Sequence, residues 1–334
     1  MKTYLRRIAV SLTAVLSLVA LGVAGVSAQT SGNKVANGFQ ISPVRSEFTI
    51  EKGKSQVLTI TIQNPTDVST TAKAVVNNFI ASDDQSGEPR LILDEKSPQP
   101  KNNFKSLVRN IPDVPLGPKE KKDVNVTISV PENASAGGYY GAIRWVPGSA
   151  SQSGNVGLTA SVGTIVLVTV PGNLNEQLDL QQLATAQNGK NMVFFRNGQV
   201  DVVTVLKNSG DIHVKPFGKI TVKKTFGKQV ASVEFNNTDP RANVLPDSTR
   251  KFVTTLPKEV EKFGRYTVEI NLGYSQGSGQ LISSKTTFWY VPPMYLLIFV
   301  AIIVLIVAAI FWIVRKSRAK RHHKHEVNKK NQQD

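Results

Sequence analysis

Residues 123–130 read DVNVTISV, in which every second residue is apolar and the residues between them are polar. A period of two is that of a β-strand with one face in a core and the other in water. The same alternation recurs in LTITI at 58–62 and in YTVEINL at 266–272. From residue 39 to 291 no apolar stripe follows a 3.6-residue period, and Asn, Gly and Pro recur at short intervals. We therefore predict an all-β region.

An internal duplication divides this region in two. The segment LTITIQNPTD at 58–67 has a counterpart in VTVLKNSGD at 203–211, and each is followed by a turn with a Leu and a Pro, a further proline and a late Tyr-containing strand. Short strands and turns of this kind are typical of Ig-like sandwiches. The sequence predicts two tandem Ig-like β-sandwich domains, at residues 39–173 and 174–291.

Each copy carries the same structural signals. Asn64 and Asn208 follow a strand, and each is expected to cap it by side-chain hydrogen bonds. Tyr140 and Tyr266 each lie nine residues after a proline, and we expect them to take equivalent places as tyrosine corners.

The segment at 294–314 consists of 21 uncharged residues, MYLLIFVAIIVLIVAAIFWIV. As a helix it would span about 31 Å, which matches a hydrocarbon core of about 30 Å. The tail at 315–334 holds eight Lys or Arg against two acidic residues, so the positive-inside rule places it in the cytoplasm and the β-region outside. No LPxTG-like sequence precedes the helix, so we expect the protein to stay in the plasma membrane.

The first 28 residues have the form of a secretory signal. Basic residues precede an apolar run at 8–26, and Val26-Ser27-Ala28 offers small residues for cleavage. We predict a signal peptide at 1–28 and a linker at 29–38. Because the apolar run is long, an uncleaved second anchor remains an alternative.

Composition restricts the chemistry of the exported part. The chain has no cysteine, which excludes disulfides and thiolate metal sites. Between the signal and the tail lie 29 basic and 22 acidic residues, and this excess favours anionic wall polymers, lipid headgroups or acidic glycans. Nucleic acid is not an expected partner outside the cell.

No enzymatic or cofactor site is predicted. GYSQG at 273–277 matches the G-x-S-x-G nucleophile pattern, but the histidines that follow it lie in the basic tail. The segment is better interpreted as a Gly-rich hairpin loop. Asp83, Asp84 and Glu88 lie within six residues but lack the spacing of a calcium loop, so whether they bind calcium stays open and no metal site is predicted.

Candidate ligand-binding residues lie in the segment at 139–145. Alternation places Tyr139 and Trp145 on one face of a strand, with Tyr140 and Arg144 on the other. A β-bulge at Gly141 would expose part of the segment, and Tyr139, Arg144 and Trp145 would then stack on sugar rings or meet acidic groups. In the alternative, Trp145 belongs to the core.

These features together resemble the WxL-interacting protein family of Gram-positive cell surfaces. The resemblance rests on FQISPV at 39–44, QNPTD at 63–67 and PENASAGGYYGAIRW at 131–145, followed by a second β-domain and a terminal helix with a basic tail. It implies a non-enzymatic surface protein whose first domain binds peptidoglycan and whose second domain binds surface or host proteins.

A second function class fits the same sequence. The chain would then be an accessory subunit of a secretion or transport complex in the membrane. Small residues in the predicted helix permit contacts with other helices but do not require them; these are Ala301, Ala308 and Ala309.

Overall fold

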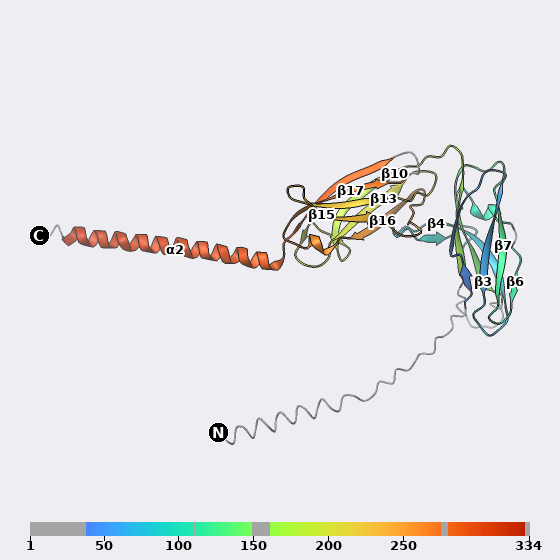
Figure 1. Ribbon diagram of the computed structural model, residues 1–334, viewed down its shortest axis with the longest axis horizontal. Helices are drawn as coiled ribbons and strands as arrows, with labels where there is room; N and C mark the ends of the chain where they lie inside the picture. The colour runs from blue at the N-terminus through green and yellow to red at the C-terminus, as the bar shows by residue number, and fades with distance from the viewer. Residues whose placement is uncertain (1–37, 110, 149–160, 275–279, 331–334) are drawn as a thin grey trace, which may run out of the picture.

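The computed structural model describes residues 38–109, 111–148, 161–274 and 280–330. It contains two β-sandwich domains in sequence order, followed by one long helix that projects from the second domain (Figure 1). The predicted signal peptide at 1–28 and most of the GYSQG segment lie outside the described residues. The predicted fold class is confirmed: two Ig-like sandwiches and a C-terminal apolar helix.

The first sandwich packs a three-stranded sheet against a six-stranded one. The smaller sheet has the order β1 (Gln40–Ser42), β3 (Ser55–Gln63), β7 (Lys121–Ser129). The larger sheet has the order β2 (Arg45–Thr49), β9 (Val162–Val170), β8 (Gly137–Pro147), β4 (Thr70–Ala81), β5 (Pro89–Leu91), with β6 (Val114–Leu116) also paired to β4. Strand β2 runs parallel to β9, and the 3-10 helix η1 (Phe104–Leu107) contacts β4 and β8.

Apolar side chains from both sheets of the first sandwich form its core. The alternating residues of β3 and β7 point inward, and Ile60, Ile62 and Ile128 are fully buried there, as the sequence pattern predicts. They pack with Trp145 of β8 and Phe104 of η1. Burial of these large side chains is what stabilises a sandwich without disulfides.

The second sandwich also consists of two sheets. One has the order β11 (Lys190–Asn191), β10 (Leu178–Gln187), β13 (Asp201–Asn208), β16 (Ser248–Thr255). The other has the order β12 (Phe194–Phe195), β18 (Leu281–Tyr290), β17 (Gly264–Gly273), β14 (Phe217–Lys224), β15 (Gln229–Phe235). The short helix η2 (Lys258–Val260) precedes β17, and a separate apolar core lies between the sheets.

The duplicated asparagines make matching hydrogen bonds. Asn64 Nδ2 donates to the carbonyl oxygens of Val68 and Gly117, both at 2.8 Å. Asn208 Nδ2 donates to the carbonyl oxygens four residues later and at Val244, also at 2.8 Å. In each copy Oδ1 accepts the backbone N–H two residues on. The predicted capping role is confirmed.

The predicted equivalence of Tyr140 and Tyr266 is wrong by one residue. Tyr139 is the counterpart of Tyr266, because the hydroxyl of each donates to the carbonyl oxygen four residues earlier, at Ser135 (3.0 Å) and Lys262 (2.8 Å). The two prolines therefore precede the corner by eight and nine residues. Tyr140 instead points out of the first sandwich, toward the second domain.

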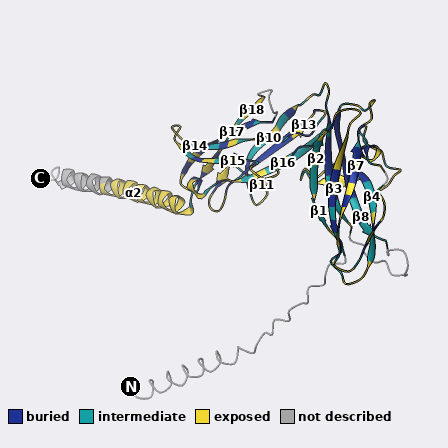
Figure 2. Cartoon of the chain, turned by 45° about the vertical axis from the view of Figure 1, so that its right-hand side comes forward, coloured by how far each residue is buried: buried dark blue, intermediate teal, exposed yellow. Residues whose placement is uncertain are grey.

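Helix α2 (Pro293–Lys330) begins three residues after β18. Residues 293–316 are long and apolar enough to cross a membrane, and no side chain of that stretch is buried in the protein (Figure 2). The helix runs beyond the predicted end at 314, because the basic tail contains neither Gly nor Pro and consists largely of good helix formers.

Candidate binding surfaces of the first domain

The β-bulge predicted at Gly141 does not form. Strands β8 and β4 pair in unbroken register from Gly141 opposite Asn78 to Pro147 opposite Ala72. Gly141 serves close packing instead, since a Cβ atom there would overlap the ring of Phe104. Without the bulge, the strand keeps its simple alternation and no additional part of it is exposed.

As a result, two of the three predicted binding residues lie in the core. Trp145 is 0% exposed and Tyr139 is 5% exposed. Burial raises the pKa of the Tyr139 hydroxyl, which is occupied by its bond to Ser135. Neither ring can stack on a sugar at the surface, and the alternative in which Trp145 belongs to the core is the one observed.

Arg144 is the predicted binding residue that reaches solvent. Its Nε donates to Oδ1 of Asn77 at 2.9 Å, and a terminal nitrogen donates to Oγ of Ser161 at 3.1 Å. These bonds hold the guanidinium against the outer face of β8 and β4. The Arg144 side chain is partly exposed there.

A flat polar surface, which we call the polar face, covers the outer side of β3 and β7. Side chains opposite each other on the two strands are hydrogen-bonded: Ser55 to Ser129 (2.9 Å), Thr59 to Asn125 (2.8 Å) and Thr61 to Asp123 (2.6 Å). These cross-strand pairs restrict the rotamers, so a row of hydroxyl, amide and carboxylate groups is held along the outer side of the two strands. The sequence contained a sign of this surface, because the polar residues that alternate with the buried apolar ones in both strands are the ones that form it.

The opposite side of the first sandwich contacts the second domain. Phe79, Tyr140 and Leu167, on the outer face of the larger sheet, form an apolar cluster with Leu245 from the β15–β16 loop. Tyr140 is 9% and Leu245 is 6% exposed, so most of this contact is shielded from water. It joins the domains by hydrophobic burial.

Beside this cluster lies a polar group that we call the clasp: Glu47, Tyr140, His213 and Lys215. The Tyr140 hydroxyl accepts the backbone N–H of His213 at 2.8 Å and lies 3.2 Å from Nδ1 of the same residue. Nε2 of His213 bonds Glu47, and Nζ of Lys215 donates to the other oxygen of Glu47 at 2.6 Å. Both ring nitrogens of His213 therefore have a hydrogen-bond partner.

The clasp changes the ionisation of its members. Partial burial acts to raise the pKa of Glu47, but hydrogen bonds and charge from His213 and Lys215 outweigh it and lower the pKa from 4.5 to about 2. Burial raises the pKa of Tyr140. Glu47 is therefore a carboxylate at physiological pH and Tyr140 is a neutral phenol.

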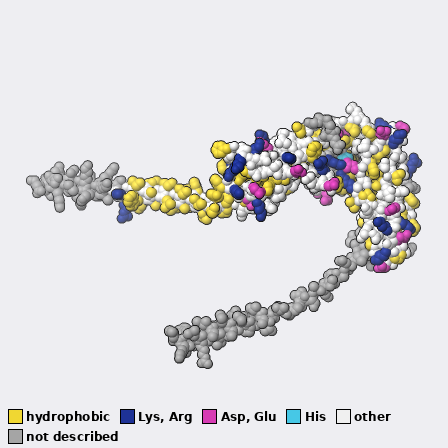
Figure 3. Space-filling model, in the orientation of Figure 1, with side chains coloured by type: hydrophobic (Ala, Val, Ile, Leu, Met, Phe, Trp, Pro, Cys, Tyr) yellow, Lys and Arg dark blue, Asp and Glu magenta, His cyan; other side chains and the backbone are white. Residues whose placement is uncertain are grey.

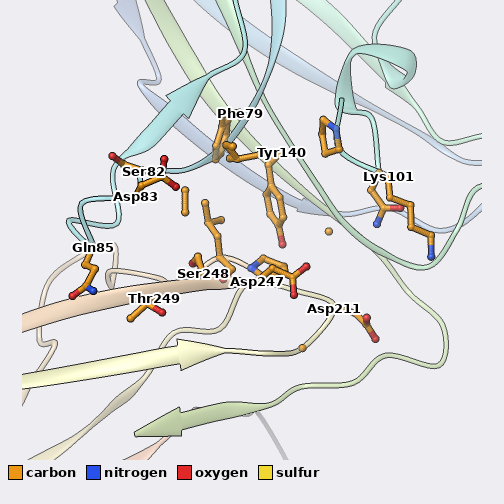
Figure 4. Close-up of a pocket in the computed structure, with 18 of the residues that line it drawn as sticks. Phe79, Ser82, Asp83, Gln85, Lys101, Tyr140, Asp211, Asp247, Ser248 and Thr249 are labelled. Atoms are coloured by element: carbon orange, nitrogen blue, oxygen red, sulfur yellow. Dashed lines mark hydrogen bonds between the residues drawn. The ribbon is translucent and has the colours of Figure 1, made fainter. Parts of the chain in front are cut away.

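A cleft of about 600 Å³ opens next to the clasp (Figure 4). It is lined by both domains, with Phe79 and Tyr140 on one side and the β15–β16 loop on the other. The charged side chains around it are Asp83, Lys101, Asp211 and Asp247. This lining suits a small polar molecule better than an acidic polymer, because acidic groups outnumber the one lysine.

The acidic segment at 83–88 forms the tip of the β4–β5 hairpin, which reaches the second domain. The carbonyl of Gln85 accepts the backbone N–H of Lys251, on edge strand β16, at 2.8 Å. Asp83 pairs with Arg90 at 3.3 Å, and Asp84 accepts the backbone N–H of Ser86 at 2.9 Å. No group of three His, Cys, Asp or Glu side chains converges as a metal site in the described ranges. The hairpin thus covers part of a sheet edge.

Comparison with known proteins identifies the class of the first domain. The family that matches is one of binding domains, and the comparison identifies no enzymatic domain. Residues 46–146 match the family described as WxL Interacting Protein, peptidoglycan binding domain. This segment of the chain is a WxL Interacting Protein peptidoglycan-binding domain, as the resemblance predicted. No curated protein matches the chain.

Solved structures with the same kind of fold include fimbrial chaperones. A chain of a chaperone–tip adhesin complex for CFA/I fimbriae and the class 5 fimbriae chaperone CfaA are each 12% identical, with 74% of this chain and 98% of that chain covered and a TM-score of 0.39. The E. coli chaperone DraB is 15% identical, with the same coverage and a TM-score of 0.33.

Proposed function

We propose that this is a non-enzymatic surface protein that binds peptidoglycan, or an anionic polymer associated with it, while anchored in the plasma membrane by α2. The match of residues 46–146 to a peptidoglycan-binding domain carries the proposal. The apolar helix and the basic tail support an orientation with the sandwiches outside the cell and residues 315–334 in the cytoplasm.

We place the wall-binding surface on the polar face. The second domain packs on part of the outer side of the larger sheet, so the outer side of the smaller sheet points away from that domain and from α2 (Figure 1). Its fixed hydroxyl and amide groups match the hydroxyl and amide groups of a glycan carrying peptides. Exposed lysines lie at its two ends and would attract an anionic polymer; these are Lys52, Lys54 and Lys121.

Arg144 is proposed as a secondary contact. Its guanidinium lies on the outer face of the larger sheet, beyond the part that the second domain covers, and it would meet carboxylates of the polymer. Tyr139 and Trp145 then contribute by supporting the strand that carries Arg144, from the core side.

The second domain is proposed to bind surface or host proteins through an edge strand. The outer edge of β15 has no partner strand in the described parts of the chain, whereas β16, at the edge of the other sheet, is partly covered by the hairpin tip. An extended segment of a partner would add to the sheet at β15 by backbone hydrogen bonds. The limits of 39–173 and 174–291 remain our prediction for separating the two domains.

The wall-binding proposal is tested by sedimentation with purified peptidoglycan sacculi, using the full chain in mild detergent. Thr59 and Thr127 are exposed on the polar face, and replacing both by Glu places two carboxylates there. We expect the pelleted fraction to fall several-fold. The matched control replaces Ser283 and Thr287, two exposed hydroxyl residues of β18, by Glu, and it should pellet like the unmodified chain.

Two results would count against the proposal. Equal pelleting of all three chains would remove the polar face as the binding surface. If the unmodified chain does not pellet at low salt, the wall-binding proposal is wrong and the accessory-subunit alternative is favoured. Stoichiometric membrane partners should then co-purify with the chain in detergent.

A further inference from the structure

The end of the second domain next to α2 is held close to the start of that helix. The backbone N–H of Val291 donates to the carbonyl of Phe195 at 2.8 Å, and that of Trp289 donates to Val193 at 2.8 Å, so the chain is fixed in the sheet almost to Pro293. The four Cα–Cα steps from Trp289 to Pro293 span at most about 14 Å. If α2 crosses the bilayer, as proposed above, this end of the domain lies at the membrane surface.

Exposed aromatic side chains from four separate segments gather at this end. Phe226, Trp289, Phe263 and Phe194 are 102%, 45%, 44% and 43% exposed. Single exposed apolar residues are ordinary on a protein surface, but four large aromatic rings at one end of a domain are not.

Strand register and contacts bring these four rings together. Phe194 lies opposite Trp289 in the parallel pair of β12 and β18, and Trp289 lies opposite Arg265 of β17. The carbonyl of Arg265 accepts the N–H of Thr225, the neighbour of Phe226, at 3.1 Å. The Phe263 ring stacks on Tyr295, in the first turn of α2, with centroids 4.8 Å apart. The aromatic end of the domain is therefore continuous with the helix.

The conformation of Phe226 adds a second, independent observation. Its φ is +71°, in the left-handed region that bulky side chains rarely adopt and that Asn or Gly would occupy at less cost. The Phe226 ring is fully exposed, so no burial within the protein offsets the cost of this backbone conformation. A contact outside the protein would explain why a Phe stands at this turn.

Basic residues surround the rings. Arg196 lies over the Phe194 ring at 6.0 Å, and Lys224 lies over Tyr266 at 5.9 Å. Basic residues outnumber acidic ones in the same loops and strand ends; the basic residues are Lys190, Arg196, Lys224, Lys228, Lys258, Lys262 and Arg265, and the acidic ones are Asp201, Glu259 and Glu261. Hydrophobic and basic side chains are seen together where the domain meets α2 (Figure 3). Aromatic rings flanked by Lys and Arg are the residues that bind at a membrane interface.

We propose that this end of the second domain docks on the outer leaflet, with Phe226 and Phe263 inserted below the headgroups and the surrounding Lys and Arg bound to anionic phospholipid headgroups. The helix and the docked rings then hold the domain at two separate points. Docking fixes the tilt of the domain on the membrane, which a single flexible tether could not do.

The experiment measures the depth of a spin label in vesicles of phosphatidylcholine and phosphatidylglycerol that contain the full chain. Because the chain has no cysteine, Thr225→Cys, Thr238→Cys and Ile303→Cys each give a single labelling position. Thr225 adjoins Phe226, Thr238 is an exposed control in the β15–β16 loop, and Ile303 lies near the middle of the apolar stretch 293–316 of α2. Access of a polar nickel complex and of oxygen to each label is then compared.

We expect the label at Thr225 to be shielded from the nickel complex several-fold more than the label at Thr238. Adding Phe226→Asn, which suits the left-handed backbone, should remove most of that shielding. If the Thr225 label is as accessible as the Thr238 label while the Ile303 label lies in the hydrocarbon, docking is wrong and anchoring stands. An accessible label at Ile303 would overturn both.

Discussion

At the scale of single residues, Trp145 and Arg144 are sequence neighbours with opposite surroundings. Trp145→Ala removes a fully buried ring from the first core, and we expect a loss of about 3–5 kcal/mol in the free energy of unfolding. Arg144→Ala removes a partly exposed side chain and should change stability by less than about 1 kcal/mol. Denaturant unfolding followed by circular dichroism measures both.

The same two variants separate structure from binding. At a temperature where Trp145→Ala is still folded, it should pellet with sacculi as well as the unmodified chain, whereas Arg144→Ala should pellet less. If Trp145→Ala pellets less while Arg144→Ala pellets normally, Trp145 and not Arg144 would be the binding residue.

At the scale of elements, the paired turns at Asn64 and Asn208 predict equal effects in the two domains. Each side chain is at most 1% exposed and makes two donated bonds to backbone carbonyls. Replacement by Ala leaves these carbonyls, most of them only partly buried, without their donor, and we expect each variant to lose about 1–3 kcal/mol. The measurement is the denaturant midpoint of each domain's transition, with Asn237→Ala, an exposed loop residue, as the control.

The elements also show what the sequence could and could not predict. Strands β3, β7 and β17 were predicted because one face of each lies in a core, and that burial leaves a visible period of two. The place of Tyr139 was missed because a spacing differing by one residue moves every side chain to the other face of a strand. The clasp was not predictable, since Glu47 and His213 are 166 residues apart and no local pattern connects them.

At the scale of the whole molecule, the clasp predicts that the joint between the domains depends on pH. The folded pKa of Glu47, about 2, lies below its ordinary value of 4.5, so its contribution to stability is complete above about pH 4.5 and is lost as the pH falls to about 2. We expect Glu47→Gln to lower the free energy of unfolding by about 1–3 kcal/mol at pH 7, because Glu47 is only partly buried.

Thermal melts between pH 7 and pH 2 measure this effect. The difference between the unmodified chain and Glu47→Gln should shrink below pH 4.5 and vanish near pH 2. Glu51→Gln, at an exposed position with no ion pair in the described residues, should follow the unmodified chain throughout. A difference that stays constant with pH would exclude the carboxylate as its cause.

The crosswise packing of the first domain on the second also has a mechanical consequence. The strands of the first domain run across the long axis of the second domain and of α2 (Figure 1). If the helix stands upright in the bilayer, the polar face lies parallel to the cell surface, one domain length above it. Many anchored copies would then hold the wall polymer at a uniform distance from the membrane. A force that pulls on the polymer would be shared among many weak contacts.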